Sequence, residues 1–346
     1  HPTDNPSGVR VAIQDAHVNY LGTRDESLWS EAEMAAGFGF ANYYFDNVGV
    51  QYGLKALMDG AITAEQFVDL NEKIGGVDID YNHQPMRTQI DPEVAQILYR
   101  TGFINDWQRM GNIPIITERP PEPDPIASHT MYHTYAARYR LNKAQGDTDN
   151  YITWLRPVGW VYYTWDDLGF TTMDKWLEGI AADQSDLSMA DKVVVNKPPE
   201  AVNGYWPDIT QPMDFSTLND FQFDWGAENL DPYPPYMTPR LVAAQGNLEA
   251  VGIVKAQLKP LERSDYAPVV FTDDQWARLQ ATFPDGVCDW TQPSIGATPS
   301  IPWLTFKNGP GGEPIGINQY GNTYQARNCS GEMRFVDPVC MNLTLR

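Results

Sequence analysis

The residues best suited to chemistry are Asp124 and, five positions later, His129, at the end of a proline-rich loop. The loop follows an apolar run at 113–117 that is typical of a buried parallel strand. Functional residues of open α/β sheets gather where strands end, so both side chains are expected beside one cleft. A carboxylate that accepts from an imidazole fixes its tautomer and stabilises the imidazolium formed during nucleophile activation. The pair could therefore serve a hydrolase, although the same spacing also fits a solvated loop without a catalytic role.

A zinc site is the other chemistry that this stretch could support. His129 and His133 are one helical turn apart, as two zinc ligands on a helix would be. The chain has no HExxH motif, and Asp124 is the one further ligand nearby. We therefore do not expect a metal there.

The nucleophile that such a pair would activate is missing. A serine on a nucleophile elbow is flanked by glycines, because the backbone is crowded at that turn. No serine in the chain has glycine two positions before it, and Ser330 is preceded by Asn328 and Cys329. Either the chain is not a serine hydrolase or the serine belongs to another polypeptide.

Three oxygen-bearing side chains alternate at Asp78, Asp80 and Asn82, as at the start of a calcium loop. His83 replaces the expected glycine and no glutamate follows at the twelfth position, so this is not an EF-hand. Calcium could bind here, but an acidic surface turn explains the pattern as well. No other cofactor is expected.

The elements that would position these residues follow from local signals. The sequence predicts strands at 9–13, 113–117 and 151–155, helices at 129–145 and 171–182, and helix starts at Thr63, Asp91 and Thr272. Gly146 is expected to end the first of these helices, and the second is expected to bury Leu177. Alternating strands and helices favour a parallel sheet, but too few strands are present to complete a doubly wound one.

Four segments are therefore expected. Residues 1–25 contribute a sheet strand and its connection, 26–111 form a helical insertion or lid, 112–184 hold the last strands and helices of the core, and 185–346 form an accessory loop-rich extension.

Composition narrows the class of protein. The net charge of −21, from 45 acidic and 24 basic residues, disfavours nucleic-acid binding. No apolar run is long enough to span a membrane. The chain begins at His1 without a leader, which predicts a processed chain or a fragment. Cys329 and Cys340 could close a small disulfide loop, leaving Cys288 over, or all three could be reduced thiols.

Several segments resemble a bacterial family related to the α/β-hydrolases, DUF6351, which is similar in outline to tannase-like esterases and hydroxybutyrate-oligomer hydrolases. The segments are 46–57 (DNVGVQYGLKAL), 69–76 (DLNEKIGG), 78–80 (DID), 113–116 (IPII), 138–141 (RYRL), 257–260 (QLKP) and 283–290 (FPDGVCDW). The resemblance covers most of residues 5–295. The family pattern often has cysteine where Ala256 stands, which leaves Cys288 without that partner here.

The resemblance implies an α/β-hydrolase-like parallel sheet of which this chain holds the C-terminal part. It implies a longer protein whose N-terminal half, or a separate chain, carries the nucleophile serine. His129 would then be the catalytic base, with His133 as its alternative, and Asp124 its acid, with Glu118 and Asp15 as alternatives because they also follow strands.

The expected function is thus that of the C-terminal part of a secreted or periplasmic bacterial serine hydrolase acting on carboxylic esters. A non-catalytic binding or structural subunit with a hydrolase-like fold, with calcium as its ligand, is the alternative.

Overall fold

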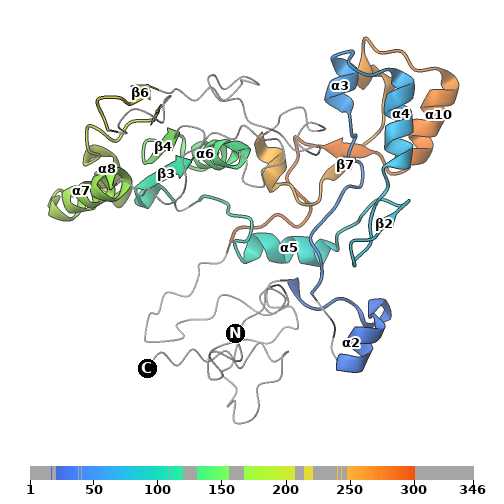
Figure 1. Cartoon of the computed structure of the whole chain (residues 1–346), viewed down its shortest axis with the longest axis horizontal. Helices are drawn as coiled ribbons and strands as arrows, with labels where there is room; N and C mark the ends of the chain where they lie inside the picture. Colours follow the sequence, from blue (N-terminus) through green and yellow to red (C-terminus); the bar gives the residue numbers. More distant parts are fainter. Residues whose placement is uncertain are drawn as a thin grey trace. The chain divides into compact units, whose positions relative to one another are not determined.

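The computed structural model describes residues 17, 21–37, 39, 41–108, 110–119, 131–155, 167–206, 214–220, 240, 243 and 248–300. The chain divides into two compact units (Figure 1). Unit 1 comprises His1–Gln51, Ala56–Asp106 and Gly252–Arg346, and unit 2 comprises Tyr52–Lys55 and Trp107–Val251. The division does not follow the four sequence segments, because residues from Gly252 onward group with part of the predicted helical insertion.

Unit 2 contains a four-stranded sheet in the order β3-β4-β5-β6. The strands are β3 (Ile115–Arg119), β4 (Tyr151–Leu155), β5 (Gly204–Tyr205) and β6 (Asn219–Asp220). β3, β4 and β5 are parallel, and β6 is antiparallel to β5. Arg119 lies opposite Leu155, so β3 and β4 end at the same edge. The mixed α/β class and the parallel pairing of the two main strands are confirmed.

Helices cover both faces of this sheet (Figure 1). They are α6 (Met131–Gln145), α7 (Leu168–Ala182) and α8 (Met189–Val195). The short helix η2 (Met110–Asn112) contacts α6 and α8, and Leu248 of η3 (Leu248–Gly252) packs against the cluster of Met131 and Leu155. Successive strand residues point to opposite faces. Leu155 packs against Met131 of α6, whereas Trp154 packs in a cluster with Trp176 of α7 and Val193 of α8. The parallel strands therefore lie between two helical layers.

The core between the sheet and the helices α7 and α8 is dominated by tryptophan. Trp154, Trp176 and Trp206 are almost fully buried. Each indole N–H donates to a backbone carbonyl, from Trp154 to Val202 at 2.7 Å, from Trp176 to Val193 at 2.7 Å and from Trp206 to Asp214 at 3.0 Å. A buried indole needs such a partner, because an unpaired donor costs about 1–3 kcal/mol. These bonds tie α8 to α7, the segment before β5 to β4, and the segment after β5 to the stretch before β6.

Unit 1 is an assembly of short elements. They are η1 (Glu26–Leu28), α2 (Glu31–Ala36), α4 (Ala64–Lys73), β1 (Gly76–Val77), β2 (His83–Gln84), α5 (Pro92–Arg100), β7 (Gln257–Lys259), η4 (Arg263–Tyr266), α10 (Asp273–Thr282) and β8 (Val287–Asp289). The helix α3 (Leu54–Met58) spans the boundary of the two units. One core forms where Val94 and Leu98 of α5 pack against Leu21 and Ile90.

The helix starts expected from the sequence are confirmed. Thr63 and Thr272 each form a capping box, with Gln66 and Gln275 respectively, and Asp91 caps α5 ahead of Pro92. Gly146 follows α6 in the left-handed conformation, as a C-terminal cap does. The expected burial of Leu177 is wrong, since its side chain is 49% exposed. The described part of the segment 26–111 also holds the hairpin β1–β2, which its helical pattern did not predict.

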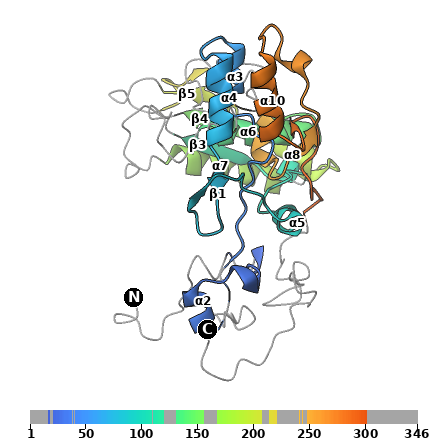
Figure 2. The ribbon, with the colours of Figure 1, turned by 90° about the vertical axis from the view of Figure 1, so that its right-hand side faces the viewer.

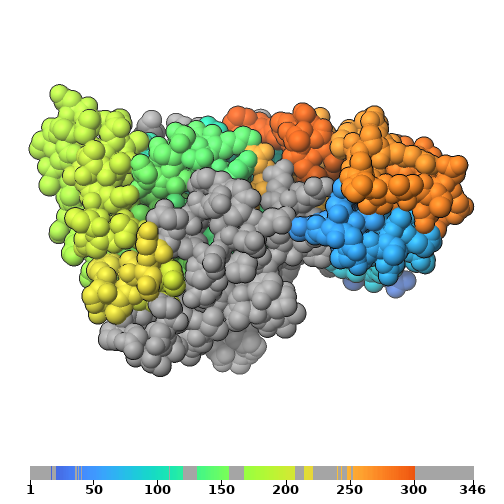
Figure 3. All heavy atoms as spheres, turned by 90° about the horizontal axis from the view of Figure 1, so that it is seen from above, coloured from blue at the N-terminus to red at the C-terminus, as the bar shows by residue number. Residues whose placement is uncertain are grey.

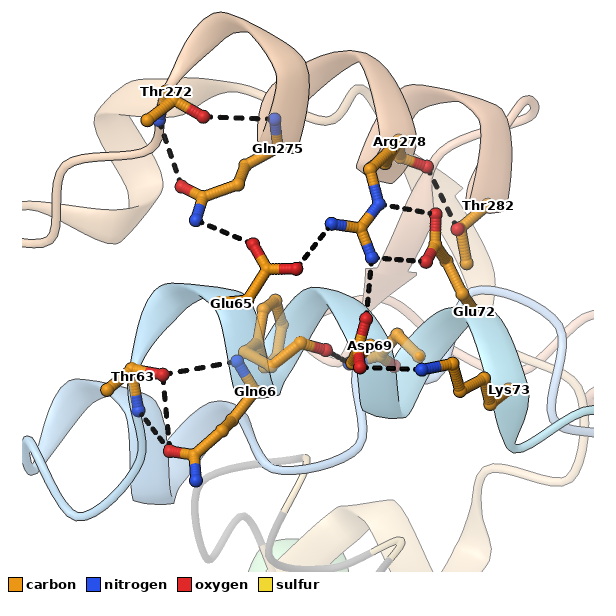
Figure 4. Close-up of polar contacts among 12 residues, drawn as sticks. Thr63, Glu65, Gln66, Asp69, Glu72, Lys73, Thr272, Gln275, Arg278 and Thr282 are labelled. Atoms are coloured by element: carbon orange, nitrogen blue, oxygen red, sulfur yellow. Dashed lines mark hydrogen bonds and ion pairs between the residues drawn. The ribbon is translucent and has the colours of Figure 1, made fainter.

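Arg278 joins α10 to α4 although the two helices are some 200 residues apart in sequence. Its guanidinium donates to Glu72 at 2.9 and 2.6 Å, to Glu65 at 2.6 Å and to Asp69 at 2.7 Å (Figure 4). The two helices lie side by side in both ribbon views and in the space-filling view (Figures 1, 2 and 3). Three carboxylates on one face of α4 thus share one cation.

This cluster predicts an acid-sensitive contact. Hydrogen bonds from Arg278 and Gln275 lower the pKa of Glu65, and those from Lys73 and Arg278 lower the pKa of Asp69. A carboxyl whose pKa is lowered by folding stabilises the protein above its unfolded pKa, and that contribution is lost as pH falls through the folded pKa. We expect Arg278→Met to lower the melting temperature by a few degrees at pH 7, and the difference from the parent to vanish at low pH.

Thermal unfolding measured from pH 7 to pH 2 checks this, with Lys73→Met as the control. Lys73 pairs with Asp69 alone on the exposed face of α4, so its loss should have the smaller effect. A pH-independent difference for Arg278→Met would contradict the ionic origin of the contact.

Candidate functional site

The candidate site of unit 2 is the edge at which β3 and β4 end. The guanidinium of Arg119, the last residue of β3, donates to the hydroxyl of Thr134 in the first turns of α6 at 3.2 Å. The start of α6 therefore lies beside the end of β3. β3 ends at the carboxyl edge of the parallel strands, and α6 begins beside that end. This is the edge at which α/β sheets place their ligands.

The five residues predicted for catalysis divide into two groups. Asp124 and His129 lie in segment 120–130, outside the described residues. Asp15 also lies outside the described residues. Glu118 and His133 are described, and both are exposed. Glu118 is the residue before the last one of β3, and His133 lies in the first turn of α6. The two described candidates therefore flank segment 120–130 in the sequence.

Glu118 points away from the α6 face. A Cβ atom added to Gly169 would come within 2.0 Å of Glu118 Oε1, so the carboxylate lies against the first turn of α7. Arg119, its neighbour, contacts α6 on the other face of the sheet. A carboxylate near a helix N-terminus is favoured by the helix dipole. Glu118 is thus directed to the α7 side of the sheet, whereas His133 belongs to α6 on the opposite side.

His133 stands next to buried tyrosines on α6. Tyr132 and Tyr135 are buried, and burial raises the pKa of both phenols. The rings of Tyr132 and His133 meet edge to face, with their centroids 6.5 Å apart. Because both phenols stay neutral at any ordinary pH, they can hold α6 in place without taking part in proton transfer.

At the other end of the strands, Arg138 of α6 fixes that helix to Tyr151, the first residue of β4. Its guanidinium donates to the Tyr151 carbonyl and to the Thr148 hydroxyl at 2.8 Å, and it lies 4.9 Å from the centroid of the Tyr151 ring. Burial lowers the pKa of Arg138 to about 10. The arginine therefore remains charged and acts as a fixed structural link, which sequence reasoning missed because none of these partners is an acidic side chain.

The predicted calcium ligands lie in unit 1, in the turn between β1 and β2. Asp78 Oδ1 accepts from the backbone N–H of Asp80 and Asn82, at 2.9 and 2.8 Å, and Asp80 pairs with Arg24 at 2.7 Å. These bonds lower the pKa of Asp78, with the Asn82 backbone as the largest cause. The carboxylates already have protein donors. Over the described residues, no group of three or more His, Cys, Asp or Glu side chains is arranged to hold a metal ion.

Cys288 is a buried thiol on β8, with its Sγ 3.2 Å from the carbonyl oxygen of Val48. It forms no disulfide within the described part of the chain. Cys329 and Cys340 lie outside the described residues, so their pairing stays a prediction.

These features define a mixed α/β protein with a partly parallel sheet. In the segments that the structure describes, no helix has the length and apolar character needed to cross a membrane. The sequence model of a tannase-like family of unknown function, DUF6351, matches residues 1–299. The chain belongs to this family, as the resemblance predicted. No curated protein and no solved structure matches it.

Proposed function

We propose that this chain is the C-terminal part of a secreted serine hydrolase that cleaves carboxylic esters. In this proposal a serine in an N-terminal half or a partner chain attacks the ester carbonyl, and His129 removes its proton. Asp124 accepts from the other imidazole nitrogen, and backbone amides supplied with the serine stabilise the oxyanion. Membership in a tannase-like family supports an esterase-type hydrolase.

One observation carries the proposal. The bond from Arg119 to Thr134 joins the end of β3 to the start of α6, the two described elements that flank segment 120–130 in the sequence. Segment 120–130 contains Asp124 and His129, the acid and base predicted from the sequence. An acid and a base that share a short segment at this edge can reach a nucleophile presented by a neighbouring strand.

A fluorophosphonate probe tests the proposal on natively purified protein. Intact mass spectrometry before and after labelling should show a second polypeptide, or a preceding segment of the same polypeptide, that gains the probe mass. Residues 1–346 should remain unlabelled. A label within these residues would contradict the assignment of the nucleophile, and no label in an intact, esterase-active preparation would contradict the serine mechanism.

A non-catalytic binding or structural subunit is the second candidate function. It is favoured by the absence of a glycine-flanked serine from the sequence. Calcium at Asp78, Asp80 and Asn82 would be its natural ligand, but the ion would have to displace Arg24 from Asp80. Stabilisation by calcium that a chelator reverses, without esterase activity, would support this candidate.

A further inference from the structure

Unit 1 contains a cavity of about 570 Å³, and Asp78 and Ile79 of the β1–β2 turn form part of its lining. This volume lies within the range of about 300–1,000 Å³ found for small-ligand sites. Its walls come from four separate stretches of the chain: the region of η1, the extended segment 42–43, the β1–β2 hairpin with its flanks, and the start of α5. Leu28, Ile79, Val94 and Ile97 supply its apolar surface.

Several donors of the neutral polar side chains in the wall are used inside the protein. The Asn42 amide donates to the carbonyls of Leu21 and Thr23, at 3.3 and 3.1 Å. The Tyr43 hydroxyl donates to the Gln89 carbonyl at 3.2 Å, and the Gln84 amide donates to the Val77 carbonyl at 3.3 Å. For a ligand, the wall therefore offers oxygen acceptors together with amide N–H groups of Gln84 and Gln89.

The carboxylates of the wall add further acceptors. Asp25 Oδ1 accepts from Ser27, and Asp91 Oδ1 accepts from the Glu93 backbone at 2.7 Å, so the second oxygen of each remains for a ligand. The bonds from Ser27 lower the pKa of Asp25, which is therefore ionised at neutral pH. Among the described residues that line the cavity there is no Lys, Arg or His. A ligand for this cavity must offer several donors and carry no negative charge.

Two exposed aromatic rings belong to chain segments that also supply wall residues, although neither ring lines the cavity itself. Phe45, two residues from Tyr43, is 41% exposed, and Tyr81, three residues from Asp78, is 59% exposed. Their centroids are 5.6 Å apart. Tyr81 has a φ of 66°, a left-handed conformation that costs a residue with a Cβ about 1–2 kcal/mol. The turn therefore holds a strained residue whose ring is left largely exposed to water.

We propose that this region of unit 1 is a binding site for a neutral, polyhydroxylated ligand, a sugar ring. Hydroxyl groups spaced around such a ring can donate to acceptors that come from separate segments, whereas one ammonium group satisfies acceptors at a single point. The C–H faces of a sugar pack on exposed rings such as Tyr81 and Phe45. A phosphate- or carboxylate-bearing ligand is repelled by Asp25, Asp91 and Glu93.

Titration calorimetry of the whole protein with cellohexaose, xylohexaose and maltohexaose tests the site. At least one of these neutral oligosaccharides should bind, with an affinity that changes little between low and high salt. Tyr81→Asn should weaken binding about tenfold, as expected when one stacking ring is lost. Asparagine tolerates the left-handed conformation, so this variant removes the ring without adding backbone strain.

The matched control is Phe170→Ala, which removes an even more exposed ring, 77% exposed, from α7 of unit 2. It should bind the oligosaccharide as the parent does, and neither variant should unfold below the parent temperature. Spermine serves as the cationic probe. Salt-sensitive spermine binding without oligosaccharide binding, equal losses in the two variants, or no binding of any oligosaccharide would overturn the proposal.

Discussion

Replacing His129 with glutamine is expected to lower ester hydrolysis by the native protein by about 10³-fold, the scale on which a general base contributes. Glutamine keeps the size and polarity of the side chain but cannot take a proton from a serine. If His129 acts as the base, the loss should fall on kcat rather than KM, because the base works in the transition state. Steady-state kinetics on a p-nitrophenyl ester measures both constants.

The chain supplies its own control for this experiment. His133 lies on the first turn of α6, is exposed, and follows His129 by four residues in the sequence. His133→Gln should leave kcat within about twofold of the parent if the assignment is right. A large loss in His133→Gln and a small one in His129→Gln would exchange the two roles. Equal, small losses would remove both histidines from the mechanism.

Lys255→Met is expected to destabilise unit 1 by about 3 kcal/mol, because it leaves a buried carboxylate without its counter-charge. The Lys255 ammonium is 3.1 Å from Asp46 Oδ2, and the two side chains are 10% and 2% exposed. Asp46 also accepts from the backbone N–H of Val48 and Ile90, both at 3.2 Å. Those two bonds remain in the variant and keep the loss at the lower end of what a broken buried pair costs.

Chemical denaturation with a double-mutant cycle measures this loss. Adding Asp46→Asn to Lys255→Met should recover part of the stability, since no uncompensated charge then remains. Lys259→Met is the control: Lys259 pairs with Asp265 on the surface, where both partners are about 40% exposed. That change should cost less than about 1 kcal/mol. Equal losses in the two lysine variants would contradict the importance of burial.

Local features of the fold were readable from the sequence because their causes are local. Thr63, Asp91 and Thr272 cap helices through side chains that reach two or three residues along the chain, so the signal and the structure share one short window. β4 was predicted at its observed bounds, since a continuous apolar run on a strand reflects burial on both faces. α8 was missed although Ser188 caps it, because its apolar residues follow no clear helical period.

Long-range features were not readable in the same way. The four bonds of Arg278 join residues more than 200 positions apart, and nothing near α10 indicates that three carboxylates of α4 will face it. The grouping of Gly252 onward with unit 1 depends on such contacts. At the candidate site, the sequence located the strand and helix that frame Asp124 and His129. It placed the strand at 113–117, whereas β3 is Ile115–Arg119, so it did not reveal that Glu118 and Arg119 are strand residues on opposite faces of the sheet.

The chain order of the two units has a consequence for the order of folding during synthesis. Unit 2 consists mainly of one uninterrupted stretch, Trp107–Val251, and can fold once that stretch is made. Unit 1 can be completed only after Lys255 and α10 have been made, and both follow that stretch. Synthesis of the stretch takes roughly 7 to 30 s at about 5–20 residues per second. Throughout that time Asp46 lacks Lys255, and the carboxylates of α4 lack Arg278. A nascent chain halted before residue 252 would therefore present unit 1 as an unfinished, protease-sensitive segment beside a folded unit 2.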